Sequence, residues 1–327
     1  MADMMASMDE ADLQSAFCDL IDQFSTQVVG QQDLARGLVL ALLCDGHVLV
    51  EGPPGTGKTR AIKMMARYLS ADFGRIQFTP DLLPADLTGS DVYTADRALV
   101  FQPGPIFNHL ILADEINRAP ARVQSALLEA MEEKQVTVGT KTYALPQPFL
   151  VMATQNSLDQ EGTYPLPEAQ LDRFLMKLTV DYPSREADLG ILKLQQAEEQ
   201  CAPSIQALVA LDQVALAREQ ISRVLVSDAI EQYIVDLVQA TRHPEKYSAA
   251  LAAWFKHGVS ARAILALHRV ARASAWLKGR DHVIPQDVKE YLAPCLGHRL
   301  SLSYEALANS VTTRDLIEAL SEHVVAH

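Results

Sequence analysis

The stretch HVLVEGPPGTGKTRAIKMMARYL, residues 47–69, decides the fold of this chain. It consists of a short apolar run, a glycine-rich loop and a segment of helix-forming residues. The loop GPPGTGKT, Gly52–Thr59, matches the pattern G-x-x-x-x-G-K-[ST]. In this pattern glycines allow tight turns, so that successive backbone N–H groups point at phosphate oxygens. The stretch therefore predicts a buried strand, a phosphate-binding loop (P-loop) and a helix whose N-terminus favours an anion.

The residue types in this loop suit a nucleoside triphosphate. Lys58 supplies a mobile cation for the β- and γ-phosphates, and Thr59 offers a hydroxyl to Mg²⁺. We expect nucleotide contacts from the whole loop and from the residue after it, namely Gly52, Pro53, Pro54, Gly55, Thr56, Gly57, Lys58, Thr59 and Arg60.

Two further apolar runs end in polar residues that suit the same site. LILADE, residues 110–115, ends in Asp114, which we expect to hold Mg²⁺, and Glu115, which we expect to polarise the attacking water. FLVMATQN, residues 149–156, ends in Asn156, whose amide can orient that water or sense the γ-phosphate. Polar residues are ordinary at strand ends, so it is the preceding P-loop that gives them this interpretation.

Two arginines further along the chain are candidates for contacts with the γ-phosphate. Arg173, in LDRF, suits an arginine finger that reaches the nucleotide of a neighbouring subunit, and a local salt bridge is the alternative. Arg262, in HGVSARAIL, opens a helix of the C-terminal half. From there it can contact the γ-phosphate across an interdomain cleft and couple the angle of the second domain to the nucleotide state.

Short apolar runs alternate with helical patterns from residue 25 to 185, which predicts an α/β domain whose parallel sheet has helices on both faces. Two β-hairpins are expected to interrupt it, at residues 88–104 and 134–146. After residue 185 helical spacing prevails, with Ser227 as an N-cap and Pro285 in a first turn. We therefore expect an N-terminal amphipathic helix (1–24), an α/β core (25–185) and a smaller all-helical domain (186–327).

The composition limits the class of protein. The 327 residues include 41 acidic and 28 basic side chains, a formal charge of −13, and 49% of them are hydrophobic, which excludes global disorder. Four separated cysteines without a CxxC pair argue against a disulfide scaffold or a zinc module. The longest apolar run, residues 37–44, is too short to span a bilayer, and the first 25 residues lack the basic region of a signal peptide. We expect a cytoplasmic protein without membrane insertion.

The order of these motifs resembles AAA+ ATPases, and several longer strings resemble the MoxR family among them. These strings are QFTPDLLPADLTG, PGPIF, LADEINRAP, QSALLEAMEE, ATQN and EGTYPLPEAQLDRF. The resemblance is dense over residues 28–185 and continues through GVSARA, GRDHVIPQDV and a closing HR within residues 258–299. One departure is Ala261, which stands where the family usually has proline.

The resemblance implies a P-loop AAA+ core, a helical lid and hydrolysis of ATP with Mg²⁺ by a hexameric ring. Such proteins remodel a protein client together with a von Willebrand factor A-domain partner. The family pattern assigns the loop 52–59 as Walker A, Asp114 and Glu115 as Walker B, Asn156 as sensor 1, Arg173 as the arginine finger and Arg262 as sensor 2. It also places adenine near Val29 and Gly30, and it identifies hairpin 88–104 as the helix-2 insert and 134–146 as the pre-sensor hairpin.

Three alternatives stay open beside this interpretation. The ATPase subunit of a metal chelatase has the same insert architecture, and a nucleotide-gated scaffold needs little turnover. A nucleic-acid motor would concentrate basic side chains in the hairpins, which carry only Arg97, Lys134 and Lys141 in an acidic chain. Within the MoxR interpretation, Arg118 is a second candidate for the arginine that acts across a subunit interface.

Overall fold

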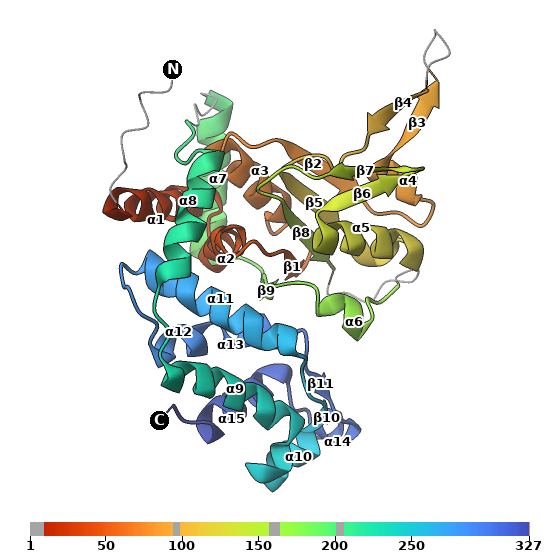
Figure 1. Cartoon of the computed structure of the whole chain (residues 1–327). Coiled ribbons are helices and arrows are strands. Elements are labelled where there is room, and N and C mark those ends of the chain that lie inside the picture. Colours follow the sequence, from red (N-terminus) through yellow and green to blue (C-terminus); the bar gives the residue numbers. More distant parts are fainter. Residues whose placement is uncertain (1–9, 94–98, 157–163, 201–205, 327) are drawn as a thin grey trace. The chain divides into compact units, whose positions relative to one another are not determined.

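The computed structural model describes residues 10–93, 99–156, 164–200 and 206–326, which form two compact units (Figure 1). One unit comprises residues 15–170 and 178–216 and contains the main sheet. The other comprises residues 1–14, 171–177 and 217–327 and is mostly helical. Helix α7 (Arg185–Gln200) belongs to the unit with the sheet, and the domain boundary at residue 185 stays a prediction.

A five-stranded sheet in the order β2-β5-β8-β1-β9 forms the centre of the first unit. Its strands are β1 (Val48–Glu51), β2 (Phe73–Gln77), β5 (Leu110–Asp114), β8 (Leu150–Gln155) and β9 (Met176–Thr179). The pairs β2–β5, β5–β8 and β1–β8 are parallel, which confirms the predicted sheet. Strands β1, β5 and β8 are buried except at their last residue, because both faces of the sheet are covered.

Helices flank this sheet. α2 (Gln32–Leu43) packs against β1 and β8, and α3 (Lys58–Tyr68) packs against β5. In the view of Figure 1, α2 and α3 lie to the left of the sheet and α5 (Ala121–Glu133) lies to its right. The other helices described up to residue 223, apart from α7, are α1 (Glu10–Gln27), α4 (Pro84–Thr88), η1 (Ile116–Arg118), α6 (Glu168–Leu171) and α8 (Leu211–Arg223). In α1 the predicted apolar face is buried at Leu13, Phe17, Leu20 and Phe24, while Ile21 is only partly buried.

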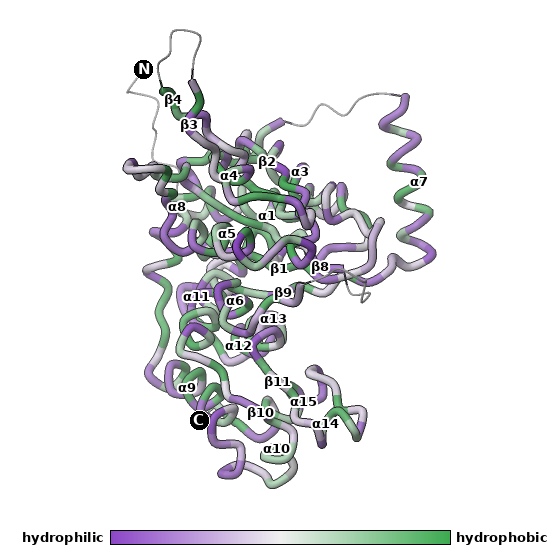
Figure 2. The backbone as a smooth tube through the Cα atoms, turned by 90° about the vertical axis from the view of Figure 1, so that its right-hand side faces the viewer, coloured by the Kyte–Doolittle hydropathy of each residue, from purple (hydrophilic) through white to green (hydrophobic). Residues whose placement is uncertain are grey.

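Both predicted hairpins are present. β3 (Gly89–Tyr93) pairs with β4 (Leu99–Pro103), and β6 (Gln135–Val138) pairs with β7 (Lys141–Ala144), in each case antiparallel. The tip at residues 94–98, with Arg97, lies outside the described residues. Figure 2 shows β4 in the green of apolar residues, and Leu99 and Val100 of this strand are exposed. The first hairpin therefore has exposed apolar side chains on the surface of this unit.

An aromatic cluster joins the two hairpins. Phe101 of β4 stacks on Tyr143 of β7, with 4.1 Å between ring centroids and 18° between ring planes. Phe107 meets both rings edge-on. Since stacked and edge-on arrangements are the favoured geometries of aromatic pairs, the cluster fixes one hairpin against the other.

The second unit consists mainly of helices. They are α9 (Asp228–Arg242), η2 (Pro244–Lys246), α10 (Ala249–Trp254), α11 (Ala261–Leu277), α12 (Pro285–Glu290), α13 (Leu292–Leu296), α14 (Tyr304–Ala308) and α15 (Thr313–His323). Ser227 caps α9 and Pro285 is the first residue of α12, as predicted. One feature departs from the all-helical expectation, because β10 (Phe255–His257) pairs antiparallel with β11 (Ser301–Leu302). The two segments are far apart in the sequence, so no local pattern indicated the pairing.

Candidate functional site

Glycines shape the phosphate-binding loop that follows β1. Gly55 and Gly57 have φ angles of 81° and 82°, in the left-handed region that favours glycine. Gly52 is needed for a different reason, because a Cβ at this position would lie 2.2 Å from the carbonyl oxygen of Val180. The loop can therefore turn tightly and lie close to the backbone of Val180, the residue after β9.

Lys58 is the first residue of α3, and its ammonium group lies over the loop. Its Nζ donates to the carbonyl oxygens of Gly52 and Pro53 over 2.6 and 2.8 Å. Burial lowers the pKa of Lys58, while the nearby carboxylates of Asp114 and Glu115 act in the opposite direction. The cation is thus held between the loop and the two acids.

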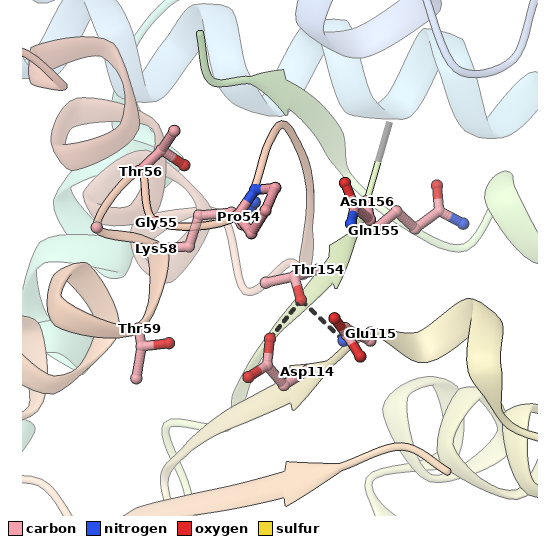
Figure 3. Close-up of a pocket in the computed structure, with 11 residues that line it drawn as sticks. Pro54, Gly55, Thr56, Lys58, Thr59, Asp114, Glu115, Thr154, Gln155 and Asn156 are labelled. Atoms are coloured by element: carbon pink, nitrogen blue, oxygen red, sulfur yellow. Dashed lines mark hydrogen bonds between the residues drawn. The ribbon is translucent and has the colours of Figure 1, made fainter. Parts of the chain in front are cut away.

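Asp114 and Glu115 lie at the carboxyl end of β5, where Thr154 of β8 connects them (Figure 3). The buried Oγ1 of Thr154 donates to Oδ1 of Asp114 over 2.8 Å and accepts from the backbone N–H of Glu115 over 2.9 Å. One hydroxyl therefore orients the carboxylate of Asp114 and the backbone of Glu115. Sequence reasoning missed Thr154, although its place in ATQN, two residues before Asn156, was a usable signal.

Glu115 has a φ angle of 56°, which is uncommon for a residue other than glycine. Its Oε2 accepts hydrogen bonds from Nη1 of Arg118 (2.8 Å) and Nε2 of Gln77 (3.3 Å). Arg75 donates through Nη2 to Oδ2 of Asp114 (2.7 Å) and to Oε1 of Gln77 (2.9 Å). Two side chains of β2 therefore link the acids. Gln77 begins the string QFTPDLLPADLTG, but the sequence patterns assigned a role to neither Gln77 nor Arg75.

The phosphate-binding loop, the two acids and the end of β8 line a pocket of about 390 Å³ within the first unit. The lining residues are Pro54, Gly55, Thr56, Gly57, Lys58, Thr59, Asp114, Glu115, Thr154, Gln155 and Asn156. Figure 3 shows Lys58 and Thr59 on one side of the pocket and the two acids on the other. All lining residues except Thr154 and Gln155 were predicted from the sequence, so the structure brings the P-loop, the acids and Asn156 together.

The oxygen donors of the pocket fit magnesium. The Thr59 hydroxyl and the Asp114 carboxylate are hard ligands, and Mg²⁺ is usually held by one or two carboxylates together with substrate phosphates. Across the part of the chain that the structure describes, no group of three or more His, Cys, Asp or Glu side chains is placed to hold a metal ion. The donor set therefore suits an ion that is bound jointly with a nucleotide.

The residues predicted to contact adenine lie against helix α7. Gly30 has a φ angle of 78°, and a Cβ there would lie 2.7 Å from the Cβ of Ala187. In the same way, a Cβ at Gly190 would lie 2.9 Å from Cγ1 of Val29. Glycines on both segments thus allow a close approach, and the contact of Val29 and Gly30 with adenine stays a prediction.

Arg60 is bound to other parts of the same unit. Its Nε donates to the carbonyl oxygen of Gln27 at the end of α1 over 2.7 Å, and its guanidinium pairs with Glu198 of α7. The hydrogen bond from Arg60 lowers the pKa of Glu198. Like Gly52 and Pro53, Arg60 is not among the residues that line the pocket, and its contact with a nucleotide stays a prediction.

Arg173 and Arg262 both belong to the second unit. Ser260 is the N-cap of α11, and its Oγ accepts from the backbone N–H of Arg262 over 3.0 Å. Nη1 of Arg262 lies 3.6 Å from Oδ2 of Asp172, the residue before Arg173. The two arginines thus have Asp172 as a common neighbour, and their contacts with a nucleotide stay predictions.

This combination of motifs occurs in known proteins. Residues 47–176 match the family described as ATPase family associated with various cellular activities (AAA), and residues 249–320 match the AAA lid domain. The chain is 43% identical over 299 residues to chaperone MoxR1 of Mycobacterium tuberculosis, covering 91% of this chain and 78% of the relative. It is 35% identical over 308 residues to protein MoxR of Paracoccus denitrificans, covering 90% of this chain and 91% of the relative.

The chain belongs to the MoxR family of AAA+ ATPases. A solved structure of a candidate ATPase from Cytophaga hutchinsonii is also similar, with a TM-score of 0.91, 43% identity and 97% of each chain covered. This MoxR-family protein is therefore an ATPase with an α/β AAA+ core and a helical lid, as the sequence indicated. Among its described residues, no helix is both long and apolar enough to cross a membrane.

Proposed function

We propose that this MoxR-family protein is a cytoplasmic, ring-forming chaperone that uses hydrolysis of Mg-ATP to mature or activate a protein client. The observation that carries the proposal is the pocket in which Lys58 and Thr59 face the Thr154-linked pair of Asp114 and Glu115. The similarity to a relative named chaperone MoxR1 supports the remodelling role. A hexamer and a von Willebrand factor A-domain partner are proposed from the resemblance to the family.

The residues of the pocket account for the steps of hydrolysis. Lys58 and the N-terminus of α3 bind the phosphates, and Lys58 balances the charge that develops on the γ-phosphoryl group. Glu115 accepts a proton from the attacking water, and Asn156 orients that water. Mg²⁺, held by Thr59 and Asp114, would neutralise charge on the β- and γ-oxygens.

A second subunit completes the proposed site through Arg173. An arginine finger accelerates hydrolysis by about 10³–10⁵-fold, so an isolated subunit should be a poor ATPase. A head-to-tail interface that places Arg173 of one subunit at the pocket of the next generates a ring when the rotation closes. The proposal therefore makes activity depend on assembly.

The decisive experiment measures ATP hydrolysis per subunit over a range of protein concentrations. We expect the rate to rise as subunits assemble, and we expect Arg173→Ala to abolish the rise while assembly, followed by light scattering, is retained. A rate per subunit of the unaltered protein that does not change with concentration would contradict the action of Arg173 between subunits.

The partner and client are tested with a variant that binds ATP but hydrolyses it slowly. Glu115→Gln, with ATP and Mg²⁺ present, should retain a von Willebrand factor A-domain protein on an affinity column. Lys58→Ala is the matched control, because it removes the phosphate-binding cation and should retain less of that partner. Equal retention by both variants, or no such protein with either, would remove the support for a nucleotide-dependent partner.

A further inference from the structure

A buried arginine holds the segment that carries Arg173. This segment lies between the end of α6 at Leu171 and the start of β9 at Met176. The side chain of Arg299, only 3% exposed, donates through Nε to Oδ1 of Asp172 over 2.8 Å. Its Nη2 donates to the carbonyl oxygens of Asp172 (3.1 Å) and Phe174 (2.6 Å). One guanidinium therefore binds the residues on both sides of Arg173.

A second side chain, that of His298, also binds the carbonyl oxygen of Phe174. His298 is buried, and its Nε2 lies 3.1 Å from the carbonyl oxygen of Phe174, to which it donates. Burial lowers the pKa of His298 well below its usual value, so the ring is neutral and has one N–H to donate. The carbonyl of Phe174 thus accepts from two neighbouring side chains, His298 and Arg299, and it is a fixed point of the segment.

Asp172 extends the network to the start of α11. Its Oδ2 accepts from the hydroxyl of Ser260 over 2.8 Å, and the Arg262 guanidinium lies 3.6 Å from the same oxygen. Asp172 is therefore bound by Arg299 on one carboxylate oxygen and by the first turn of α11 on the other. All these residues lie in the second unit, which does not contain the P-loop.

The burial of Arg299 and His298 needs a reason beyond general stability. A buried charge pair roughly balances its desolvation cost, and an apolar pair of similar volume is often as stabilising. What such a network does supply is a unique geometry, because each donor of the guanidinium fork has a defined acceptor. The geometry that is fixed here is that of the backbone of Arg173.

We propose that Asp172 and Arg299 are positioning residues. They fix the backbone of Arg173 to the second unit, which also carries Arg262, so that the two arginines keep a constant position relative to each other. The proposal rests on the proposed function, in which Arg173 acts on the nucleotide of the neighbouring subunit. Arg299 acts through the backbone of residues 172–174, without touching the nucleotide. Since displacement of a catalytic group by about 1 Å can reduce a rate about 100-fold, a loosened segment should cost much of the contribution of Arg173.

The test uses mixtures of two inactive variants. Arg173→Ala keeps an intact pocket but lacks the finger, whereas Lys58→Ala keeps Arg173 but cannot hold the phosphates. Mixed rings should regain ATP hydrolysis, because Lys58→Ala subunits supply Arg173 to the pockets of Arg173→Ala subunits. We then add Arg299→Lys, which keeps the charge but loses the fork, to one kind of subunit at a time.

Arg299→Lys in the Lys58→Ala subunit should lower the regained kcat about tenfold or more, with the KM for ATP little changed. The same change in the Arg173→Ala subunit should leave the regained rate within about twofold, since no finger is left there to position and the backbone of Arg262 is held by α11 and its Ser260 cap. Arg280→Lys is the matched control in the Lys58→Ala subunit. Arg280 is another arginine of the second unit, and it donates through Nη1 and Nη2 to Asp287 over 2.7 and 2.6 Å.

The two arrangements of Arg299→Lys separate a positioning role from a merely structural one. Equal losses in both arrangements, or no loss in either, would overturn the proposal. If Arg299→Lys does not fold, Asp172→Asn in the Lys58→Ala subunit takes its place, with the same loss expected. If Lys58→Ala subunits that keep Arg299 fail to activate Arg173→Ala subunits, Arg173 does not act between subunits. The proposed function then fails in this respect, and the positioning role fails with it.

Discussion

The hydroxyl of Thr154 donates to Oδ1 of Asp114 over 2.8 Å and accepts the backbone N–H of Glu115 over 2.9 Å. A single oxygen atom of strand β8 thus fixes the residue expected to hold Mg²⁺ and the backbone of the residue expected to activate water. The φ angle of 56° at Glu115 is less favourable than an ordinary strand or helix conformation, and this hydrogen bond helps to maintain it. We therefore expect Thr154 to contribute to catalysis by holding these two residues in place.

We predict that Thr154→Val lowers kcat about 10- to 100-fold, with little change in the KM for ATP. Valine has the same shape but leaves the Glu115 N–H and one oxygen of Asp114 without this partner, a cost of about 1–3 kcal/mol. That loss corresponds to about 5- to 160-fold in rate if it falls on the transition state, and the predicted decrease lies in the middle of this range. Thr154→Ser, which keeps the hydroxyl, should retain most of the activity, and steady-state kinetics of both variants would check the prediction. A kcat of Thr154→Val equal to that of the unaltered protein would contradict it.

Arg118 forms its ion pair within its own subunit, to Oε2 of Glu115 over 2.8 Å. We predict that Arg118→Ala lowers ATP hydrolysis about two- to tenfold, because the Glu115 side chain loses a partly exposed ion pair worth about 0.5–1.5 kcal/mol. We further predict that Lys58→Ala subunits, which carry an intact Arg118, do not restore Arg118→Ala subunits. Arg173→Ala subunits, treated in the same way, serve as the positive control. Restoration of Arg118→Ala in mixed rings would instead identify Arg118 as an arginine that acts between subunits.

The local sequence motifs identified most of the residues that line the pocket, and the roles of these residues stay predictions. The glycines, Lys58 and Thr59 follow one another in a motif, and Asp114 and Asn156 each end an apolar run. Parallel strands that are buried on both faces read as continuous apolar stretches, so the sheet was also predictable. These features can be recognised from residues that are close together in the sequence.

The missed residues depend on contacts between distant segments. Gln77 reaches Glu115 because β2 lies beside β5. The order of the strands in the sheet cannot be predicted from the hydrophobic pattern of either strand. Arg299 reaches Asp172 across 127 positions of sequence, and in the sequence it was no more than part of a closing HR. Side chains that orient catalytic groups from other elements therefore became visible only with the fold.

The environment of Asp287 indicates how the stability of the second unit depends on pH. It is fully buried and pairs with Arg280 and Lys278. Burial by itself raises the pKa of Asp287, but hydrogen bonds from Arg280, the Ile284 backbone and Lys278 outweigh it, so the pKa is lowered. A lowered pKa in the folded state contributes stability above the pKa of the unfolded chain, about 3.9, and this contribution is lost as the pH falls through the folded value.

We predict that Asp287→Asn lowers the free energy of unfolding by about 1.5–3 kcal/mol at neutral pH, since the partly exposed cations Arg280 and Lys278 lose their charge-assisted hydrogen bonds to a buried carboxylate. The difference from the unaltered protein should stay constant from pH 7 to about 5 and shrink below about pH 4. Denaturant titrations across this range would measure it. Asp281→Asn is the control, because the Asp281 side chain is 90% exposed and should show a small effect. A difference that grows as the pH falls would refute this account.

The stacking of Phe101 on Tyr143 predicts that the two hairpins are energetically coupled. Aromatic pairs in this geometry contribute about 0.5–1.5 kcal/mol beyond the burial of their surface. In a double-mutant cycle with Phe101→Leu and Tyr143→Leu, the coupling in the free energy of unfolding should fall in this range. Leucine keeps an apolar side chain at each position, so the cycle isolates the ring contact from general burial.

The same contact should be visible in hydrogen exchange. Tyr143→Leu, in β7, should speed amide exchange in β3 and β4, although neither strand is altered, because the support of Phe101 is lost. Tyr93→Leu is the matched control. Tyr93 lies at the end of β3 and is 78% exposed, so its replacement should leave exchange in β6 and β7 unchanged. If Tyr143→Leu changes exchange only within its own hairpin, the hairpins move independently and the stacked rings transmit nothing between them.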